Sequence, residues 1–265
     1  MEMKKKLIAI DNGHGLETAG KRTPPLPEDV IINGAIVRRK GEYIHEKEYN
    51  RAVADKLIPA LQRCGFDTLD VAEGVTDVSL AERYNAANRA KADIFISIHY
   101  NASGKNTFWN GGYSVVFVSQ YAGDNSKRLA SYINEEIANA TAWRTEGVQA
   151  DYKYMGINVA VLRNTTMPAA LVEAGFMDVW EQAKLMLDPA FQSACAEALC
   201  KAVCRYFDAE YIEPKPVTDV IYALQLGAYT DFANAANALN EIKGKGFSDA
   251  YIIVKNIKNQ TYTEV

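Results

Sequence analysis

The sequence predicts an α/β fold, with a mostly parallel, twisted sheet flanked by helices on both faces and a small C-terminal βαβ unit. Three observations predict it. Short apolar runs typical of buried strands alternate with segments whose apolar residues recur at helical spacing. Several of these runs end at polar residues, as strands do at the carboxyl edge of a parallel sheet. A proline-containing stretch then separates a second, shorter pattern near the C-terminus.

The predicted strands are short and mostly apolar. Leu7 to Ile10 is the first, and the glycines of the following Asp11-Asn12-Gly13-His14-Gly15 mark a tight turn. Residues 16–41 contain three prolines and no periodicity, which predicts a long loop. The later strands of this part of the chain are predicted at residues 66–71, 94–98, 115–118 and 169–172.

The predicted helices have recognisable start and stop signals. Gly65 ends the first helix, and Ser79 with Glu82 has the capping-box spacing that begins the second. Asp188 followed by Pro189 is typical of an N-cap and the first helical residue of a helix. The predicted helices cover residues 49–64, 79–90, 129–140 and 189–208.

The C-terminal pattern is too short to build much core of its own. A strand at residues 221–226, a helix at 231–243 and a strand at 251–254 give the predicted βαβ unit. The run Glu213-Pro214-Lys215-Pro216 is typical of a stiff, exposed linker. We therefore predict a main domain over residues 1–212, a linker over residues 213–217 and a small module over residues 218–265.

Composition excludes some classes of function. The chain has 265 residues, 48% of them apolar, and a net charge of -4, which disfavours binding to nucleic acid because Lys and Arg must dominate such a surface. No apolar stretch is long enough for membrane insertion. The first ten residues lack the apolar core of a secretory signal, so we expect a protein made in the cytoplasm without a signal peptide.

The cysteines are Cys64, Cys195, Cys200 and Cys204. Cys200 and Cys204 share a helix face, but no histidine lies nearby in the sequence and no second cysteine pair completes a metal-binding set. We therefore predict that the cysteines are small buried hydrophobic residues rather than a redox or zinc site.

Two of the three histidines and one glutamate follow predicted strands. His14, His99 and Glu173 each stand just past a strand end, so the carboxyl edge of the sheet would bring them together. Zinc accepts histidine and carboxylate ligands, and catalytic zinc sites combine three protein ligands with a water. His45 and Glu46 are adjacent, and either one could complete the set, because neighbouring residues point in different directions.

Four sequence blocks occur in a fixed order along the chain. They are Asp11-Asn12-Gly13-His14-Gly15, then Glu46-Lys47-Glu48-Tyr49-Asn50, then Leu80-Ala81-Glu82-Arg83 leading to Ser97-Ile98-His99-Tyr100-Asn101, and finally Pro168 with Leu171-Val172-Glu173-Ala174-Gly175-Phe176. Together they resemble the zinc-dependent N-acetylmuramoyl-L-alanine amidases of amidase family 3. The resemblance covers roughly residues 5–208.

The resemblance implies a peptidoglycan hydrolase that cleaves the amide bond between N-acetylmuramic acid and L-alanine. Carried over by position, it implies that His14, Glu46 and His99 hold Zn²⁺ and that Glu173 is the catalytic carboxylate; it therefore favours Glu46 over His45. The apolar neighbours of Glu173 would raise its pKa and favour proton transfer. The competing hypotheses are a zinc peptidase that acts on the stem peptide and a non-catalytic wall-binding protein.

Three further residues are weaker candidates for the site. Asp11 could orient His14 as a partner outside the metal ligands, or only shape the turn. Asn101 and Arg163 lie in loops next to the sequence blocks and could contact the muropeptide, although such residues are often only structural or solvated.

Two other segments suggest a biological context. The segment from Thr18 to Pro24 resembles phage and prophage endolysins, which implies action at the bacterial cell wall after release through a phage-encoded pore. The tail, with Tyr222 to Tyr229 and Gly246-Phe247, resembles the first half of a SPOR domain, a peptidoglycan-binding module. The second helix and last strand of that domain are absent, so an open strand edge would allow a homodimer through this module.

Overall fold

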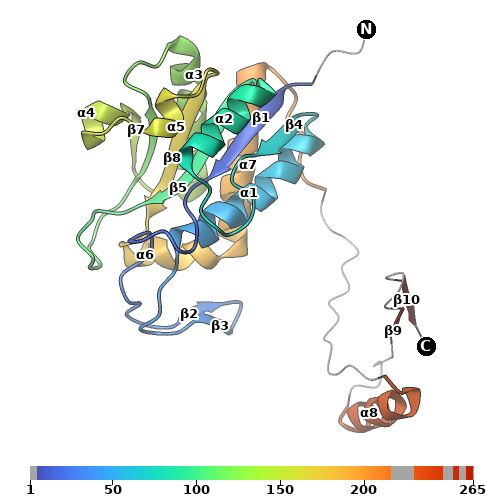
Figure 1. Cartoon of the computed structure of the whole chain (residues 1–265). Helices are drawn as coiled ribbons and strands as arrows, with labels where there is room; N and C mark the ends of the chain where they lie inside the picture. The colour runs from blue at the N-terminus through green and yellow to red at the C-terminus, as the bar shows by residue number, and fades with distance from the viewer. Residues whose placement is uncertain (1–4, 216–229, 247–252, 257–260, 265) are drawn as a thin grey trace. The chain divides into compact units, whose positions relative to one another are not determined.

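The computed structural model describes residues 5–215, 230–246, 253–256 and 261–264. The chain divides into two compact units, Met1–Pro214 and Lys215–Val265. The first unit, called the catalytic unit below, contains a six-stranded sheet with helices on both of its faces (Figure 1). None of the helices in the described parts of the chain is both long enough and apolar enough to cross a membrane.

The strands of the central sheet lie in the order β4-β1-β5-β8-β6-β7. Four of them, from β4 to β8, run parallel, whereas β6 runs antiparallel to β8 and parallel to β7. The predicted fold class, a mostly parallel sheet between helices, is therefore confirmed. The strands are β1 (Leu7–Asn12), β4 (Asp67–Asp70), β5 (Ile94–Asn101), β6 (Ser114–Val118), β7 (Thr145–Ala150) and β8 (Ala169–Phe176).

Side-chain alternation along the strands builds two cores. Ile94, Ile96 and Ile98 of β5 belong to the larger core, beneath α1 (Glu46–Arg63), α3 (Asp124–Thr141) and α7 (Pro189–Phe207). Phe95, between them, belongs to the smaller core on the other face, which α2 (Leu80–Ala90) and α5 (Ala160–Arg163) cover. Burial on both faces explains why these strands are continuous apolar runs in the sequence.

The cap signals in the sequence correspond to observed helix ends. Ser79 accepts a hydrogen bond from Glu82 N, and the Glu82 carboxylate accepts one from Ser79 N, so the predicted capping box of α2 is confirmed. Asp188 caps α7 by accepting a hydrogen bond from Ala190 N. Between residues 145 and 187, the short elements that the sequence did not predict are β7, α4 (Asp151–Met155), α5, α6 (Trp180–Ala183) and a 3₁₀ helix (Lys184–Leu187).

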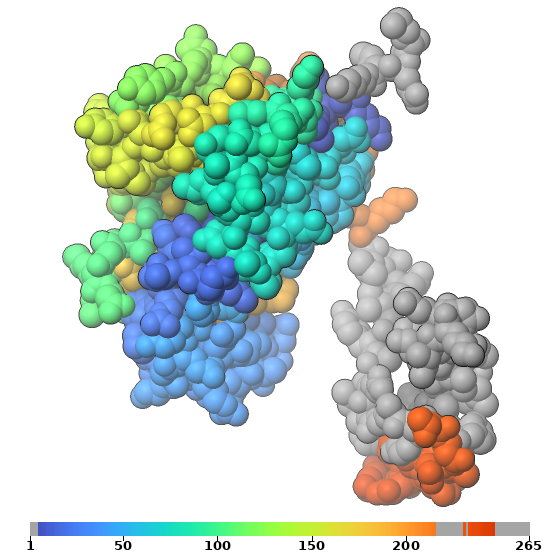
Figure 2. All heavy atoms as spheres, in the orientation of Figure 1, coloured from blue at the N-terminus to red at the C-terminus, as the bar shows by residue number. Residues whose placement is uncertain are grey.

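The loop predicted over residues 16–41 is partly wrong, because it contains a β-hairpin. Strands β2 (Val30–Ile32) and β3 (Ala35–Arg38) pair antiparallel around Asn33 and Gly34, which have φ values of 52° and 80°. Asn-Gly suits this turn because both of its central residues need positive φ. Figure 2 shows the segment that carries this hairpin (blue) exposed at one end of the catalytic unit.

The second unit contains one described helix and one described hairpin. Asp231 accepts a hydrogen bond from Asn234 N and caps α8 (Phe232–Gly244), at the position predicted for the helix. The following β9 (Ile253–Asn256) pairs antiparallel with β10 (Thr261–Glu264), a strand that the sequence did not predict. The strand predicted at residues 221–226 lies outside the described residues, so the βαβ arrangement stays a prediction.

Candidate zinc and catalytic site

The turn after β1 presents His14 between two glycines that cannot be replaced without a clash. A Cβ on Gly13 would lie 2.1 Å from His99 Cε1, and one on Gly15 would lie 2.3 Å from Asp77 N. His14 itself has φ 61°, an uncommon value for a residue with a side chain. The sequence Gly13-His14-Gly15 is therefore required by the close approach of this turn to its neighbours.

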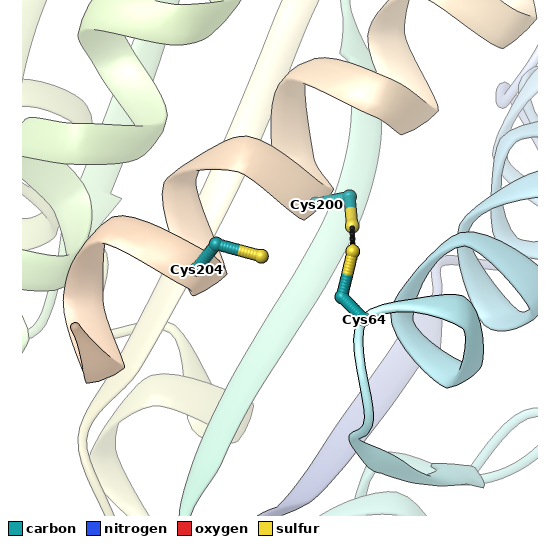
Figure 3. A group of neighbouring side chains, drawn as sticks. All are labelled: Cys64, Cys200 and Cys204. Carbon is teal, nitrogen blue, oxygen red and sulfur yellow. Dashed lines mark hydrogen bonds between the residues drawn. The ribbon is translucent and has the colours of Figure 1, made fainter. Parts of the chain in front are cut away.

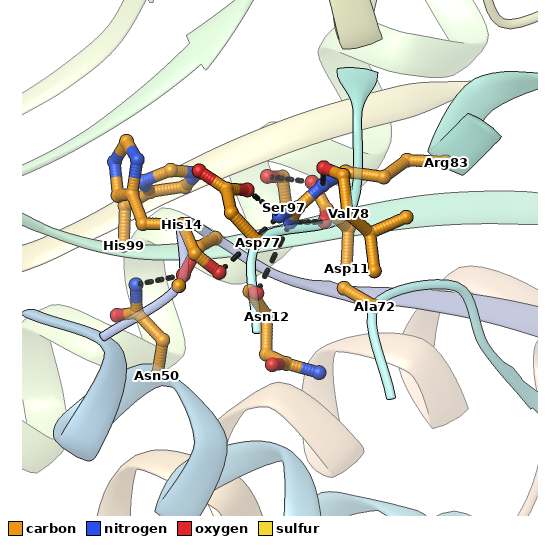
Figure 4. A network of polar contacts seen from close by, with 12 residues as sticks. Asp11, Asn12, His14, Asn50, Ala72, Asp77, Val78, Arg83, Ser97 and His99 are labelled. Carbon is orange, nitrogen blue, oxygen red and sulfur yellow. Dashed lines mark hydrogen bonds and ion pairs between the residues drawn. The ribbon is translucent and has the colours of Figure 1, made fainter. Parts of the chain in front are cut away.

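Arg83 of α2 holds this turn in place from below the surface (Figure 4). Its guanidinium is 1% exposed and pairs with Asp11 at 2.6 Å and with Asp77 at 2.7 Å. It also donates hydrogen bonds to the backbone carbonyl oxygens of Asn12 and His14, both at 3.2 Å. A single buried side chain thus fixes the backbone that carries the first candidate ligand.

We expect Arg83→Met to destabilise the catalytic unit by about 3–5 kcal/mol, because it leaves the buried carboxylate of Asp11 without its cation. Urea unfolding of the metal-free protein measures this free energy. Arg89→Met, at an exposed position of the same helix, is the matched control and should change stability by less than about 0.5 kcal/mol. Equal effects of the two substitutions would contradict the role given to Arg83.

Glu46 is the first residue of α1 and lies between the two histidines. Its Oε1 lies 2.9 Å from His99 Nδ1 and accepts hydrogen bonds from Tyr100 N at 3.1 Å and from the Asn50 amide at 3.4 Å. Its Oε2 lies 3.3 Å from His14 Nε2. The side chain is only 1% exposed, so α1 places a buried carboxylate directly beside both imidazoles.

The sheet register places Glu173 beside His99. The two residues are Cα partners in the parallel pairing of β5 with β8. Paired residues on neighbouring strands point to the same face of a sheet, so both side chains lie on one side. Both strands extend beyond their predicted ends, to Asn101 and Phe176, so His99 and Glu173 belong to the strands rather than to the loops that follow.

The three predicted ligands fit a zinc ion. One ligand atom from each of His14, Glu46 and His99 lies within 4.8 Å of the others. His14 Nε2, Glu46 Oε2 and Glu173 Oε2 are buried and have no hydrogen-bond partner, an arrangement that is costly unless a cation or water binds there. Two nitrogens and one carboxylate oxygen are a donor set that catalytic zinc accepts.

Electrostatics in the site favour the ligand forms of His14 and Glu46. Burial lowers the pKa of His14 to about 4, so its imidazole is neutral at pH 7. Burial opposes ionisation of Glu46. The hydrogen bond and charge of His99 and the charge of His14 outweigh burial and lower the pKa of Glu46 to about 2. For His99, burial lowers the pKa, whereas the hydrogen bond to Glu46 raises it above the usual value. A proton on His99 and a cation would therefore compete for the same carboxylate.

Glu173 has the opposite behaviour to Glu46. Burial raises the pKa of Glu173 to about 8; the charge of His99 opposes this shift and that of Glu46 adds to it. Two neighbouring carboxylates with pKa values pushed apart are typical of an acid–base site, in which one binds as an anion and the other carries a proton.

We expect Gly13→Ala to weaken zinc binding by about tenfold or more, because the added methyl group would displace the His99 ring. Equilibrium dialysis of zinc against a competing chelator measures this affinity. Gly123→Ala is the matched control, because a Cβ at Gly123 meets no atom within 4 Å. Unchanged zinc affinity in Gly13→Ala would show that the ring is free to move.

The weaker candidates from the sequence lie in different places. Both Asp11 oxygens accept hydrogen bonds, one from Arg83 and one from Ser97, so Asp11 acts on His14 only through Arg83. Asn101 ends β5, two residues after His99, and its side chain accepts a hydrogen bond from Ala102 N. Within the described part of the chain, no metal-type cluster includes His45, which is the N-cap residue of α1.

Arg163 lies away from the other candidates. It is exposed, donates to Asn158 O at 3.0 Å and lines a hollow together with Pro168 and Ala169 at the amino end of β8. Glu173 lies four residues further along that strand, about 13 Å away along its axis. The structure therefore does not bring Arg163 to the three candidate ligands.

Two buried cations in the site were not found from the sequence. In the sequence, Arg83 and Lys47 are only members of the blocks described above, and neither was predicted to be buried. Lys47, which is 1% exposed, donates hydrogen bonds from Nζ to Asn12 O at 3.1 Å and Ala72 O at 3.3 Å, and burial lowers its pKa to about 8. Lysine and arginine on a helix are usually solvated, so only the tertiary contacts show these roles.

Comparisons with known proteins agree with this geometry. The sequence profile of the N-acetylmuramoyl-L-alanine amidase family matches residues 8–205. The N-acetylmuramoyl-L-alanine amidase CwlM of Bacillus licheniformis is 32% identical over 249 residues, which cover 94% of this chain and 85% of that protein. The endolysin of Bacillus phage SPP1 is 30% identical over 202 residues, which cover 75% of this chain and 65% of the endolysin.

Solved structures show the same fold. The catalytic domain of CwlV, an N-acetylmuramoyl-L-alanine amidase from Bacillus (Paenibacillus) polymyxa var. colistinus, has a TM-score of 0.61 and 26% identity, and the match covers 77% of this chain and 99% of that domain. An N-acetylmuramoyl-L-alanine amidase from Clostridium difficile 630 has a TM-score of 0.62 and 26% identity over 77% of this chain and 97% of that structure. On the family profile, the relatives and the fold, the chain belongs to the N-acetylmuramoyl-L-alanine amidase family.

Proposed function

We propose that this peptidoglycan hydrolase cleaves the amide bond between N-acetylmuramic acid and L-alanine with the help of one Zn²⁺ ion. The observation that carries the zinc dependence is that buried ligand atoms of His14 and Glu46, next to His99, have no hydrogen-bond partner. Membership of the amidase family supports the choice of this bond.

His14, Glu46 and His99 would hold the ion. When bound, Zn²⁺ supplies Lewis-acid polarisation of the scissile carbonyl group and of the attacking water. The protein supplies the geometry: Tyr100 N and the Asn50 amide fix the Glu46 carboxylate, and Gly13 leaves room for the His99 ring. Because these groups are already in place, little reorganisation is needed before the reaction.

Glu173 would move the proton. As an anion, its carboxylate takes a proton from the attacking water, and as an acid it returns that proton to the departing nitrogen of L-alanine. Amide cleavage needs this second transfer, because an unprotonated amine anion is a poor leaving group. Burial of Glu173, which raises its pKa, favours the acid form that this second transfer needs.

The endolysin context is part of the same proposal. The similarity to the endolysin of Bacillus phage SPP1 supports a phage or prophage lysin that reaches the cell wall through a phage-encoded pore. The C-terminal module would then bind glycan, or pair with a second copy of itself in a homodimer.

Digestion of purified peptidoglycan tests the reaction and its metal dependence together. We expect the full-length protein to release stem peptides with a free L-alanine amino group, a strong chelator to abolish this release, and added Zn²⁺ to restore it. Mass spectrometry of the products identifies the bond that is cut. Cleavage inside the stem peptide would contradict the proposed bond, and full activity of the metal-free protein would contradict the zinc dependence.

A further inference from the structure

A second group of potential metal ligands lies in the catalytic unit, at the opposite end of α1 from Glu46. Cys64 is the C-cap residue of α1, whereas Glu46 is its first residue, so about 27 Å of helix separates them. Cys200 and Cys204 lie one turn apart on α7. Figure 3 shows these two side chains pointing from α7 toward Cys64. The sequence pattern considered only the pair on α7 and did not predict that Cys64 would join it.

The three sulfur atoms lie close enough together to approach one ion. They all lie within 4.8 Å of one another, and Cys200 Sγ lies 3.6 Å from Cys64 Sγ. Zinc–thiolate bonds of about 2.3 Å at tetrahedral angles place sulfur atoms about 3.8 Å apart. A disulfide would instead need a separation of about 2.05 Å and would leave the third cysteine unused.

We propose that Cys64, Cys200 and Cys204 form a thiolate site for a thiophilic divalent ion of the Zn²⁺ class, distinct from the catalytic centre. Three thiolate ligands select such soft or borderline ions over Mg²⁺ and Ca²⁺. A water or another small ligand completes the tetrahedron, because Cys64 is only half-buried and leaves one side of the cluster accessible.

A hydrogen-bond donor and a cation lie next to the cluster. Ile212 N donates a hydrogen bond to Cys64 Sγ at 3.4 Å. Arg63 lies beside the cluster, where it pairs with Glu197 and donates to Ile212 O at 2.8 Å.

The location gives the ion a structural role. It would join the end of α1 to the last two turns of α7, beneath the segment around Ile212 that contacts Cys64. Metal bound only by the folded protein adds its binding free energy to folding stability. The bound ion would therefore fasten the C-terminal edge of the catalytic unit against local unfolding.

The test uses full-length Glu46→Ala protein, in which the catalytic ligand set is broken, prepared without metal and kept reduced. We expect this protein to bind about one Co²⁺ or Zn²⁺ per chain, with the near-ultraviolet sulfur-to-cobalt charge-transfer band that only thiolate ligands produce. Added Zn²⁺ should also raise its melting temperature. Absence of the band would overturn the proposal.

Cysteine variants in the same background identify the ligands. Cys64→Ser, at a half-buried position, and Cys204→Ala should each lose the charge-transfer band and the thermal shift. Cys195→Ala is the matched control, because Cys195 is buried on the same helix but lies outside the cluster, and it should keep both signals. Retention of the band in Cys64→Ser, checked for native circular dichroism, would overturn the three-thiolate site. The catalytic site has no sulfur ligand, so the band reports on the cysteine cluster whether or not the catalytic proposal holds.

Discussion

Replacing Glu173 with glutamine should lower kcat for amide hydrolysis by about 10²–10⁴-fold, the usual contribution of a general acid–base group. Glutamine keeps the size of the side chain but can neither accept the proton of the attacking water nor return it to the leaving nitrogen. The zinc content should stay that of the wild type, because Glu173 lies beside His99 but outside the ligand cluster.

Two measurements separate this effect from a structural one. Metal analysis shows whether the ion is retained, and turnover of purified peptidoglycan gives kcat. Glu181→Gln provides the matched control, because Glu181 is a carboxylate with a 75% exposed side chain on α6, and its loss should leave kcat unchanged. Turnover within a factor of about three of the wild type in Glu173→Gln would remove Glu173 from the proton-transfer role.

Replacing Glu46 with alanine should abolish stable zinc binding at the catalytic site and, with it, activity. The loss of affinity should exceed the roughly 10–100-fold that substitutions outside the ligand set cost. Glu46 is the buried carboxylate between the two imidazoles, 2.9 Å from His99 and 3.3 Å from His14, so its removal leaves the two histidines without their shared carboxylate.

The neighbouring histidine provides the control for that experiment. His45→Ala should keep its zinc, because His45 caps α1 and belongs to no metal-type cluster among the described residues. Inductively coupled plasma mass spectrometry measures the zinc content of both purified variants. The Cys64→Ser substitution shows how much of that zinc is bound at the cysteine cluster. Loss of the catalytic ion from His45→Ala alone would favour a site of three histidines instead.

Much of the site could be found from the sequence because its ligands lie at the ends of elements with strong local signals. His14, His99 and Glu173 follow or end apolar strands of a parallel sheet, and such strands present their carboxyl ends at one edge. The resemblance of four sequence blocks to a known family then added Glu46, which periodicity alone could not separate from His45.

Other features depended on contacts that no local pattern encodes. The β2–β3 hairpin had a local signal, Asn33-Gly34 between apolar residues, but the surrounding prolines favoured a loop. Arg163 lies shortly before the last sequence block, yet α5 leads into the amino end of β8, so the helix lies at the opposite end of that strand from Glu173. Sequence proximity to a motif therefore did not imply proximity to the site.

Short-range periodicity and side-chain chemistry were enough to predict the alternation of strands and helices, the helix caps and the candidate zinc ligands. Which charges are buried and which distant residues meet depends instead on long-range packing. Arg83 reaches the His14 turn, and Cys64 reaches Cys200 across 136 positions, because helices on the two faces of the sheet pack against it at fixed places. That packing depends on the whole core rather than on any segment of it.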